Sequence, residues 1–157
     1  MPKPDHPIFP ADKASLALAR RLLSGSATAA LAFSDPDNGL PAISRIGFGL
    51  DHQRQPLTLL SDLASHSRAL RARPDCALLL GDPGPKGDPM ASPRLSLAVQ
   101  ARFLLPDDPS LADLRQSWLS THPKAQLYIG FADFHFVRFT VTSAFLNGGF
   151  GRATRLT

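Results

Sequence analysis

Glutamate is absent from this 157-residue sequence, and cysteine occurs once, as Cys76. A single cysteine excludes an internal disulfide and a thiolate metal cluster, so the sequence suits a reducing compartment and we expect a cytoplasmic protein. All 13 acidic residues are aspartates, so any carboxylate that acts as a general acid or base must be an aspartate. No apolar run approaches the roughly 20 residues that cross a bilayer, and the first ten residues lack the apolar core of a secretory signal. We therefore expect no membrane partner.

Lysine is also scarce, because the 17 basic residues are 13 arginines and only 4 lysines. The net charge of +4 and the pI near 9.8 indicate an anionic partner. The basic residues are spread along the chain without a run, so a nucleic-acid partner is not expected. An excess of arginine favours fixed, bidentate contacts with phosphate or carboxylate, although biased codon usage would give the same excess. The charge pattern therefore favours a small anionic molecule.

The composition, with 43% hydrophobic and 19% charged residues, is that of one globular domain. The start of the chain is rich in proline, so we expect residues 1–12 to form a flexible arm. The domain itself is expected over residues 13–153, followed by a short tail at residues 154–157.

Local patterns predict both helices and strands. Helices are expected over residues 13–24, with Asp12 as the N-cap, over 65–73, and from Ser110, where Asp113 completes a capping box. A shorter helical piece is expected from Pro123 to Tyr128. Short apolar or alternating runs separated by turn residues predict strands over 27–33, 41–50, 57–60, 76–80, 94–105 and 133–146.

These elements indicate an α+β domain with about six strands. Short, regular strands suit a small barrel, which hides its edges, but periodicity alone does not separate a barrel from an open sheet. In the last strand the apolar face changes between Phe136 and Val137, which predicts a β-bulge near that point.

The segment from Ser61 to Arg68 concentrates polar side chains where a strand ends and a helix begins. A helix N-terminus offers free N–H groups and a partial positive charge, and hydroxyl and basic side chains add further donors. The segment can therefore hold a phosphate. The alternative is an ordinary serine N-cap with exposed polar neighbours.

The order of several motifs resembles a known family. The motifs are Ser44-Arg45, Leu59-Leu60-Ser61-Asp62, Ser65-His66-Ser67-Arg68 and Arg73-Pro74. In this order they resemble the FMN-binding split-barrel family related to pyridoxamine 5′-phosphate oxidase. Segments 87–96, 122–125 and 148–152 resemble its haem-utilisation branch, without the extra C-terminal domain of longer members. The resemblance covers about residues 13–153.

The resemblance implies a six-stranded antiparallel split β-barrel with flanking helices, and FMN bound at the interface of a homodimer. Ser61, Ser67 and Arg68 would hold the flavin phosphate, with His66 as a further donor. Ser44, Arg45 and Ile46 would lie beside the flavin ring. Asp62 would cap the loop or contact the ribityl chain.

The sequence departs from the oxidase itself in two ways. The oxidase has an adjacent Arg-Lys pair where this chain has His66-Ser67, and its C-terminal substrate-binding Arg and His are absent. Oxidation of pyridoxamine phosphate is therefore not expected. The resemblance leads us to expect an FMN-dependent oxidoreductase acting on a small molecule that the sequence does not identify, with no catalytic residue identified.

Two other functions remain open. The first is a haem-binding or haem-degrading protein, in which His135 would be the axial ligand. The second is a non-catalytic module that binds a flavin or an anionic metabolite. Apart from haem iron, no metal site is expected, because the histidines are not at paired spacing and have no cysteine or glutamate beside them.

Overall fold

The computed structural model describes residues 8–149 and 152–156 of the chain. In these residues there are three α-helices, α1 (Lys13–Gly25), α2 (Ser65–Ala72) and α3 (Leu111–Thr121), and two 3-10 turns, η1 (Pro89–Ala91) and η2 (Pro123–Leu127). The strands are β1 (Ile8–Phe9), β2 (Thr28–Ser34), β3 (Pro41–Gly47), β4 (Gly49–Leu50), β5 (Pro56–Ser61), β6 (Asp75–Leu80), β7 (Arg94–Phe103), β8 (Phe134–Asn147) and β9 (Ala153–Arg155). The predicted α+β class is confirmed.

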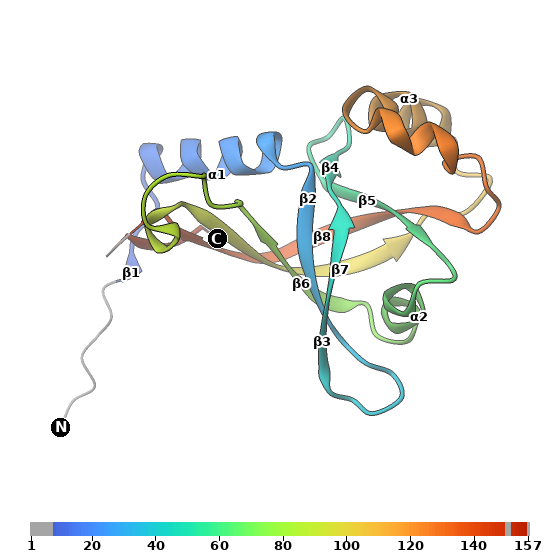
Figure 1. Cartoon of the computed structure of the whole chain (residues 1–157), viewed down its shortest axis with the longest axis horizontal. Helices are drawn as coiled ribbons and strands as arrows, with labels where there is room; N and C mark the ends of the chain where they lie inside the picture. The colour runs from blue at the N-terminus through green and yellow to red at the C-terminus, as the bar shows by residue number, and fades with distance from the viewer. Residues whose placement is uncertain (1–7, 150–151, 157) are drawn as a thin grey trace.

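All the strands belong to one sheet, whose main path runs β1-β9-β8-β7-β6-β2-β3 (Figure 1). The described residues form nine strands rather than the predicted six, and the sheet is mixed rather than antiparallel throughout, because β1 pairs with β9 in parallel. The predicted strand over 41–50 is interrupted at Phe48 and becomes β3 and β4. Strands β1 and β9 have only two and three residues, too few for alternation to reveal them.

Each of the two predicted terminal segments contributes residues to a strand. Ile8 and Phe9 belong to the predicted flexible arm, yet they form β1. Strand β9 crosses the predicted start of the C-terminal tail at residue 154. The rest of the arm at residues 1–7, as well as residues 150–151 and 157, lies outside the described residues.

The 14-residue strand β8 connects two parts of the molecule. It pairs with β7 along most of its length, with β9 at its C-terminal end, and with β5 at its N-terminal end. Helix α1 lies over the sheet near β9, whereas α3 lies at the opposite end of β8 (Figure 1). The fold therefore has an α1 end and an α3 end.

Two hydrophobic cores meet at β5 and β8. Leu60 and Val137 are buried in the main core, while Leu59 and Phe136 are buried in a second core beneath α3. Neighbouring residues of a strand point to opposite faces, so Phe136 and Val137 are both buried without any bulge. The predicted bulge near residues 136–137 is therefore wrong. The register shift lies further along β8, at Thr142, opposite Ala98 and Val99.

The predicted N-cap of α1 is confirmed. The Asp12 carboxylate accepts a hydrogen bond from the Ser15 N–H at 2.7 Å, and the Ser15 hydroxyl accepts one from the Asp12 N–H at 2.9 Å. The predicted capping box of α3 is wrong, because the Ser110 side chain makes no capping hydrogen bond. Instead, the Asp108 carboxylate accepts a hydrogen bond at 2.9 Å from the N–H of Ser110, two residues later, and so forms an Asx turn.

Helix α3 packs through Trp118 onto the interruption between β3 and β4. A Cβ atom on Gly47 or on Gly49 would lie 3.0 Å from the Trp118 ring. The His122 ring stacks on Trp118 with 4.0 Å between centroids, and its Nε2 is 2.9 Å from the Ala27 carbonyl oxygen. The two glycines therefore allow the close approach of α3. No helix in the described part of the chain is long and apolar enough to span a bilayer.

Candidate functional site

The residues predicted for a flavin site lie on both sides of an interruption between β3 and β5. Strand β3 pairs with β2, whereas β5 pairs with β4 and β8, so no ladder of backbone hydrogen bonds joins β3 to β5. Thr58 Oγ1 links the two strands by donating to the Gly47 carbonyl oxygen at 2.6 Å. The predicted residues come from β3 (Ser44, Arg45, Ile46), from the end of β5 (Ser61, Asp62) and from α2 (His66, Ser67, Arg68).

The serines at this site are used to hold α2 against the end of β5. Ser67 is fully buried, and its hydroxyl donates to the Ser61 carbonyl oxygen at 2.6 Å. The Ser61 hydroxyl donates to Asp133 Oδ2 at 2.6 Å and accepts from the Leu63 N–H at 3.1 Å. A phosphate held by these hydroxyls would have to replace existing hydrogen bonds.

Arg68 already has an anionic partner in this structure. Its guanidinium makes two hydrogen bonds, of 3.0 and 2.8 Å, to Asp37 in the turn between β2 and β3. These hydrogen bonds, together with the charge of Arg68, lower the pKa of Asp37. Both side chains are exposed, and water weakens exposed ion pairs, so Arg68 can exchange Asp37 for another anion at little cost.

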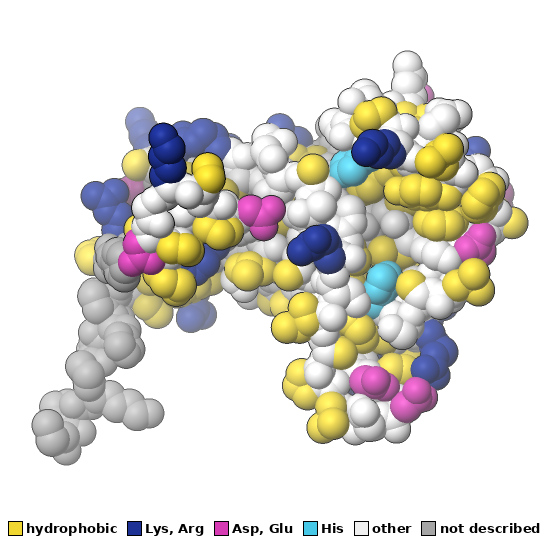
Figure 2. Space-filling model, viewed as in Figure 1, with side chains coloured by type: hydrophobic (Ala, Val, Ile, Leu, Met, Phe, Trp, Pro, Cys, Tyr) yellow, Lys and Arg dark blue, Asp and Glu magenta, His cyan; other side chains and the backbone are white. Residues whose placement is uncertain are grey.

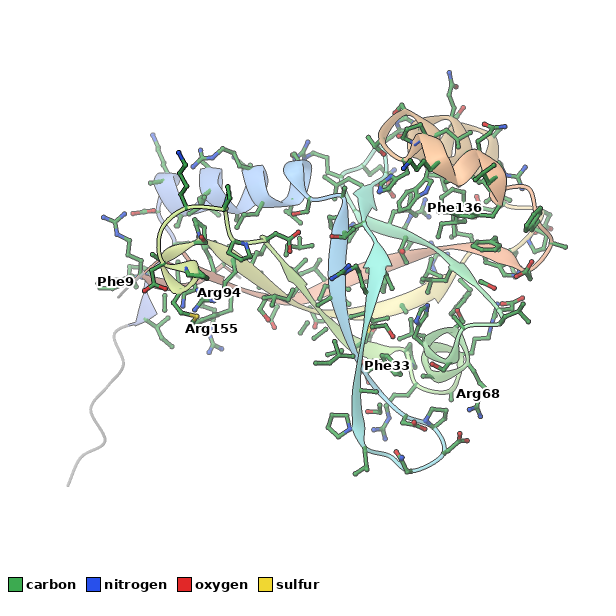
Figure 3. The ribbon with its side chains drawn as sticks, in the orientation of Figure 1. Phe9, Phe33, Arg68, Arg94, Phe136 and Arg155 are labelled. Carbon is green, nitrogen blue, oxygen red and sulfur yellow. The ribbon has the colours of Figure 1, made fainter. Side chains whose placement is uncertain are left out.

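His66 is half-buried on α2, and its ring lies edge-on to Phe33 with 6.3 Å between the ring centroids. Phe33 and Arg68, which mark this region, are labelled in Figure 3. Burial lowers the pKa of His66, because the charged imidazolium loses hydration. The neutral form of His66 is therefore favoured. A neutral imidazole is a weaker donor to phosphate than the cation would be.

The three predicted residues of β3 do not share one environment. Ile46 is buried in the main core, Ser44 is half-buried and Arg45 is exposed. Ser44 and Arg45 both line a groove of about 320 Å³ that also includes Ile43 and Leu79. Because neighbouring strand residues point to opposite faces, Arg45 and Ile46 cannot present their side chains to the same ring face.

Asp62 joins α2 to β8 through two hydrogen bonds. Its carboxylate accepts from Arg71 at 3.0 Å, and its second oxygen lies 2.8 Å from Nε2 of His135. Burial acts to raise the pKa of Asp62, but the hydrogen bonds and charges of Arg71 and His135 outweigh it, so that pKa is below its ordinary value. The Arg71 guanidinium lies 3.8 Å from the centroid of the Phe103 ring, which fixes it over an aromatic face.

His135 lies beside an aromatic pocket at the α3 end. Its side chain is 20% exposed. The pocket has a volume of about 250 Å³ and is lined by His135, three phenylalanines of β8 and the preceding loop, and Arg115 of α3. The phenylalanines are Phe131, Phe134 and Phe136, the last of which is labelled in Figure 3. The pocket thus combines a histidine ring, aromatic side chains and the cation of Arg115.

The sequence did not indicate Asp133, Arg71 or Arg115 as site residues. Asp133 is hydrogen-bonded to Ser61, which is 72 residues away in the sequence, and His135 to Asp62, which is 73 residues away. Both contacts follow from the pairing of β5 with β8, in which Leu60 lies opposite His135. Only the strand register brings these side chains together, and a single sequence does not give that register.

The sequence matches a family described as CREG, beta-barrel, over residues 10–157. It is 31% identical over 140 residues to the non-canonical heme oxygenase HOZ, chloroplastic, of Arabidopsis thaliana, and the match covers 83% of this chain and 42% of that protein. A solved structure of a heme binding protein from Mycobacterium smegmatis is 28% identical, with a TM-score of 0.82, over 94% of this chain and 59% of that one. The chain therefore spans about half the length of these two relatives.

A more distant structure connects the fold with the pyridoxinephosphate oxidase family. A protein of the pyridoxinephosphate oxidase family from Clostridium acetobutylicum is 15% identical, with a TM-score of 0.70, over 94% of this chain and 96% of that one. At this identity the likeness shows the fold alone. Together these matches confirm the resemblance to the oxidase-related split-barrel fold and its haem-utilisation branch.

Proposed function

Because the chain belongs to the CREG β-barrel family and two of its relatives are named for haem, we propose that it binds haem. The relatives related to flavin chemistry are more distant in sequence, at 15% identity for the Clostridium protein. Haem therefore takes first place and FMN second, which reverses the order expected from the sequence. The Arabidopsis relative is chloroplastic, so a cytoplasmic location stays a prediction.

The observation that carries this proposal is the His135–Asp62 pair beside the aromatic pocket. Ligand histidines usually hold their second ring nitrogen against a carboxylate, which fixes the ring and raises its basicity. Asp62 occupies Nε2 of His135, which leaves Nδ1 as the nitrogen without a partner among the residues described. His135 of this chain is thus prepared to hold iron through Nδ1.

The other residues of the pocket also suit haem. Phe131 and Phe134 offer aromatic surface to a flat macrocycle, and Arg115 offers a cation to a propionate. Phe136 lines the pocket but is buried in the second core. When bound, haem would supply the iron chemistry. The chain would orient it through His135, exclude water with the phenylalanines and hold its carboxylate with Arg115.

The size of the pocket favours the expected homodimer. Its volume of about 250 Å³ lies below the roughly 300–1,000 Å³ typical of ligand sites, so it can enclose only part of a haem. We therefore include in the proposal a second copy of the chain that covers the rest of the ligand.

FMN binding with oxidoreductase activity is the second candidate. It is favoured by the convergence of β3, the end of β5 and α2 on the interruption of the sheet. Helix α2 begins with no side-chain cap and no acidic residue in its first turn, so its N-terminus suits a phosphate. Under this reading Arg68 would leave Asp37 and pair with the flavin phosphate, while Asp62 would face the ribityl chain.

The third function, a binding module without turnover, is separated from the second by kinetics. A flavin-dependent oxidoreductase consumes a nicotinamide donor continuously, whereas a binding module does not. Sustained NAD(P)H consumption by the FMN-loaded protein would exclude the binding module.

Haem titration of a His135→Ala variant tests the proposed ligand. Loss of the ligand should weaken haem binding by at least the factor of about 10–100 that loss of an outer partner usually costs, and should shift the Soret band. His52→Ala is the matched control, because His52 is exposed in the turn before β5. Equal haem affinity and spectra for the two variants would exclude His135 as the ligand.

A further inference from the structure

A second groove, at the α1 end of the sheet, has no role in the proposed haem site. Its volume is about 760 Å³, which lies within the range of small-molecule sites. It lies between β1, α1 and the turn from β8 to β9. Its lining includes Phe9, Leu18, Arg21, Leu146, Arg152 and Thr154. The groove and His135 are at opposite ends of β8, since Leu146 and His135 are near its two ends.

Two described residues of the motif at 148–152, Gly148 and Arg152, line this groove. A Cβ on Gly148 would lie 3.5 Å from Leu18 of α1, and one on Gly149 would lie 3.1 Å from the Ala91 carbonyl oxygen. Gly149 also has φ +128°, which side chains disfavour. The Gly148 N–H donates to the Arg152 carbonyl oxygen at 2.8 Å and closes the turn. Gly149 is therefore the glycine that the close approach to Ala91 requires, whereas Gly148 lies at an ordinary contact distance from α1.

The polar groups of the groove are mainly cations and donors. Neither Arg21 nor Arg152 has an ion-pair or side-chain hydrogen-bond partner within residues 8–149 and 152–156. Thr154 is only 6% exposed, and its hydroxyl has no hydrogen-bond partner in the same ranges. The acidic residue of the lining is Asp12, whose carboxylate is engaged at 2.7 Å by the Ser15 N–H at the start of α1.

The remaining walls are apolar. Phe9, Leu18 and Leu146 line the groove together with Ala11 and Ala14 near the start of α1. Lysine and arginine side chains gather around α1 at the left of Figure 2, and Arg94 and Arg155 lie at the same end in Figure 3. An apolar groove with unpaired arginines in a basic part of the surface complements a molecule with an apolar body and an anionic head.

We propose that this groove binds a small amphipathic anion, at a site separate from the haem pocket. The apolar body would pack against Phe9, Leu18 and Leu146. The carboxylate or phosphate head would pair with Arg21 and Arg152 and accept a hydrogen bond from Thr154. The proposal does not depend on haem binding, because the two sites share no residue.

Calorimetric titration of the full chain with decanoate and with decyl phosphate tests this site, and decanol serves as the neutral comparison. We expect one of the two anions to bind at least tenfold more tightly than decanol, and the tighter anion identifies the head group. The double variant Arg21→Gln/Arg152→Gln should lose at least tenfold in affinity for that anion. Arg115→Gln, which removes an arginine at the other end of the molecule, is the matched control and should bind the anion as the unmodified chain does.

The same variants separate this proposal from the haem proposal. The double arginine variant should keep its haem affinity, and His135→Ala should keep its affinity for the anion. Equal binding of the anion by the double arginine variant and the unmodified chain, or binding no tighter than that of decanol, would overturn the groove proposal. Displacement of haem by saturating anion would overturn the separation of the two sites.

Discussion

Asp62 is the residue on which the proposed haem site depends, because it connects α2, β5 and β8. It receives hydrogen bonds from Arg71 and from His135, and Arg71 is in turn fixed over Phe103. Its neighbour Ser61 is tied to Asp133, two residues before His135. The orientation of the His135 ring is therefore set by contacts from three elements.

The sequence predicted part of this arrangement. It grouped Ser61, Asp62, Ser67 and Arg68 as a phosphate site. In the structure Ser67 is hydrogen-bonded to Ser61, whereas Asp62 contacts Arg71 and His135, and Arg68 contacts Asp37. The sequence proposed His135 as a haem ligand without its partner, because the Asp62 contact depends on the register of β5 and β8. Cys76 is partly buried against the main core, and this burial raises the pKa of its thiol to about 12, which keeps it protonated.

His66 should make the stability of the fold depend on pH. Its pKa is lowered in the folded chain by burial, whereas an unfolded chain has the ordinary histidine value near 6.5, so below that value the unfolded state binds more protons. The free energy of unfolding should therefore fall as the pH drops from about 7.5 to about 5.5. In a His66→Gln variant this fall should be smaller.

Urea unfolding at the two pH values measures the effect of His66. His52→Gln serves as the control, because His52 is exposed in a turn. An equal loss of stability on acidification in His66→Gln and in the unmodified chain would contradict the assignment.

Among the elements, α3 shows most clearly what packing adds to the sequence pattern. The spacing of Leu111, Leu114 and Trp118 puts them on one helix face, and Leu114 and Trp118 are buried in the second core with Leu111 packed against them. The surface that receives it was not predicted. Gly47 and Gly49 had no evident role in the sequence, because the partner that requires them lies about 70 residues away.

The wrong element predictions have physical causes of the same kind. The phase change in β8 was interpreted as a bulge because one core was assumed, whereas β5 and β8 each face two cores. The predicted capping box at Ser110 does not form because the Asp108 carboxylate accepts from the Ser110 N–H, the group that Asp113 would have bonded. In both cases the local pattern was present and a second contact determined the structure.

Substitution of Gly47 by alanine tests the contact between α3 and β3. The new Cβ would lie 3.0 Å from the buried Trp118 ring, and overpacking of this kind usually costs about 1–3 kcal/mol. Urea unfolding should show this loss for Gly47→Ala. Gly130→Ala is the matched control, since a Cβ there would meet no atom within 4 Å. A Gly47→Ala variant as stable as Gly130→Ala would show that α3 does not pack against β3 as described.

For the whole molecule, the two ends of the sheet have different characters. Exposed apolar side chains gather beside α3 and basic side chains around α1 (Figure 2). The fold class and the family were predicted from composition, periodicity and the order of motifs. The separation into two ends was not, because it depends on strand order, which places β1 and β9 by α1 and the loop before β8 by α3.

Light scattering tests the expected homodimer. The pocket beside His135 is too small to enclose a whole planar cofactor, so a second copy should complete the site. At micromolar concentration we expect a mass of about twice 16.9 kDa. A mass equal to that of the single chain, both with and without haem, would contradict a shared site.

The measurement that tests the central claim most directly is an absorption titration of the purified chain with haem and, in parallel, with FMN. The proposed function predicts a Soret band that shifts from that of free haem, saturates, and co-elutes with the protein on gel filtration. It also predicts that FMN at the same concentrations elutes from the gel-filtration column separately from the protein. Flavin bands that co-elute with the protein, with no change in the haem spectrum, would contradict the haem proposal and restore the flavin site around Ser61, Ser67 and Arg68.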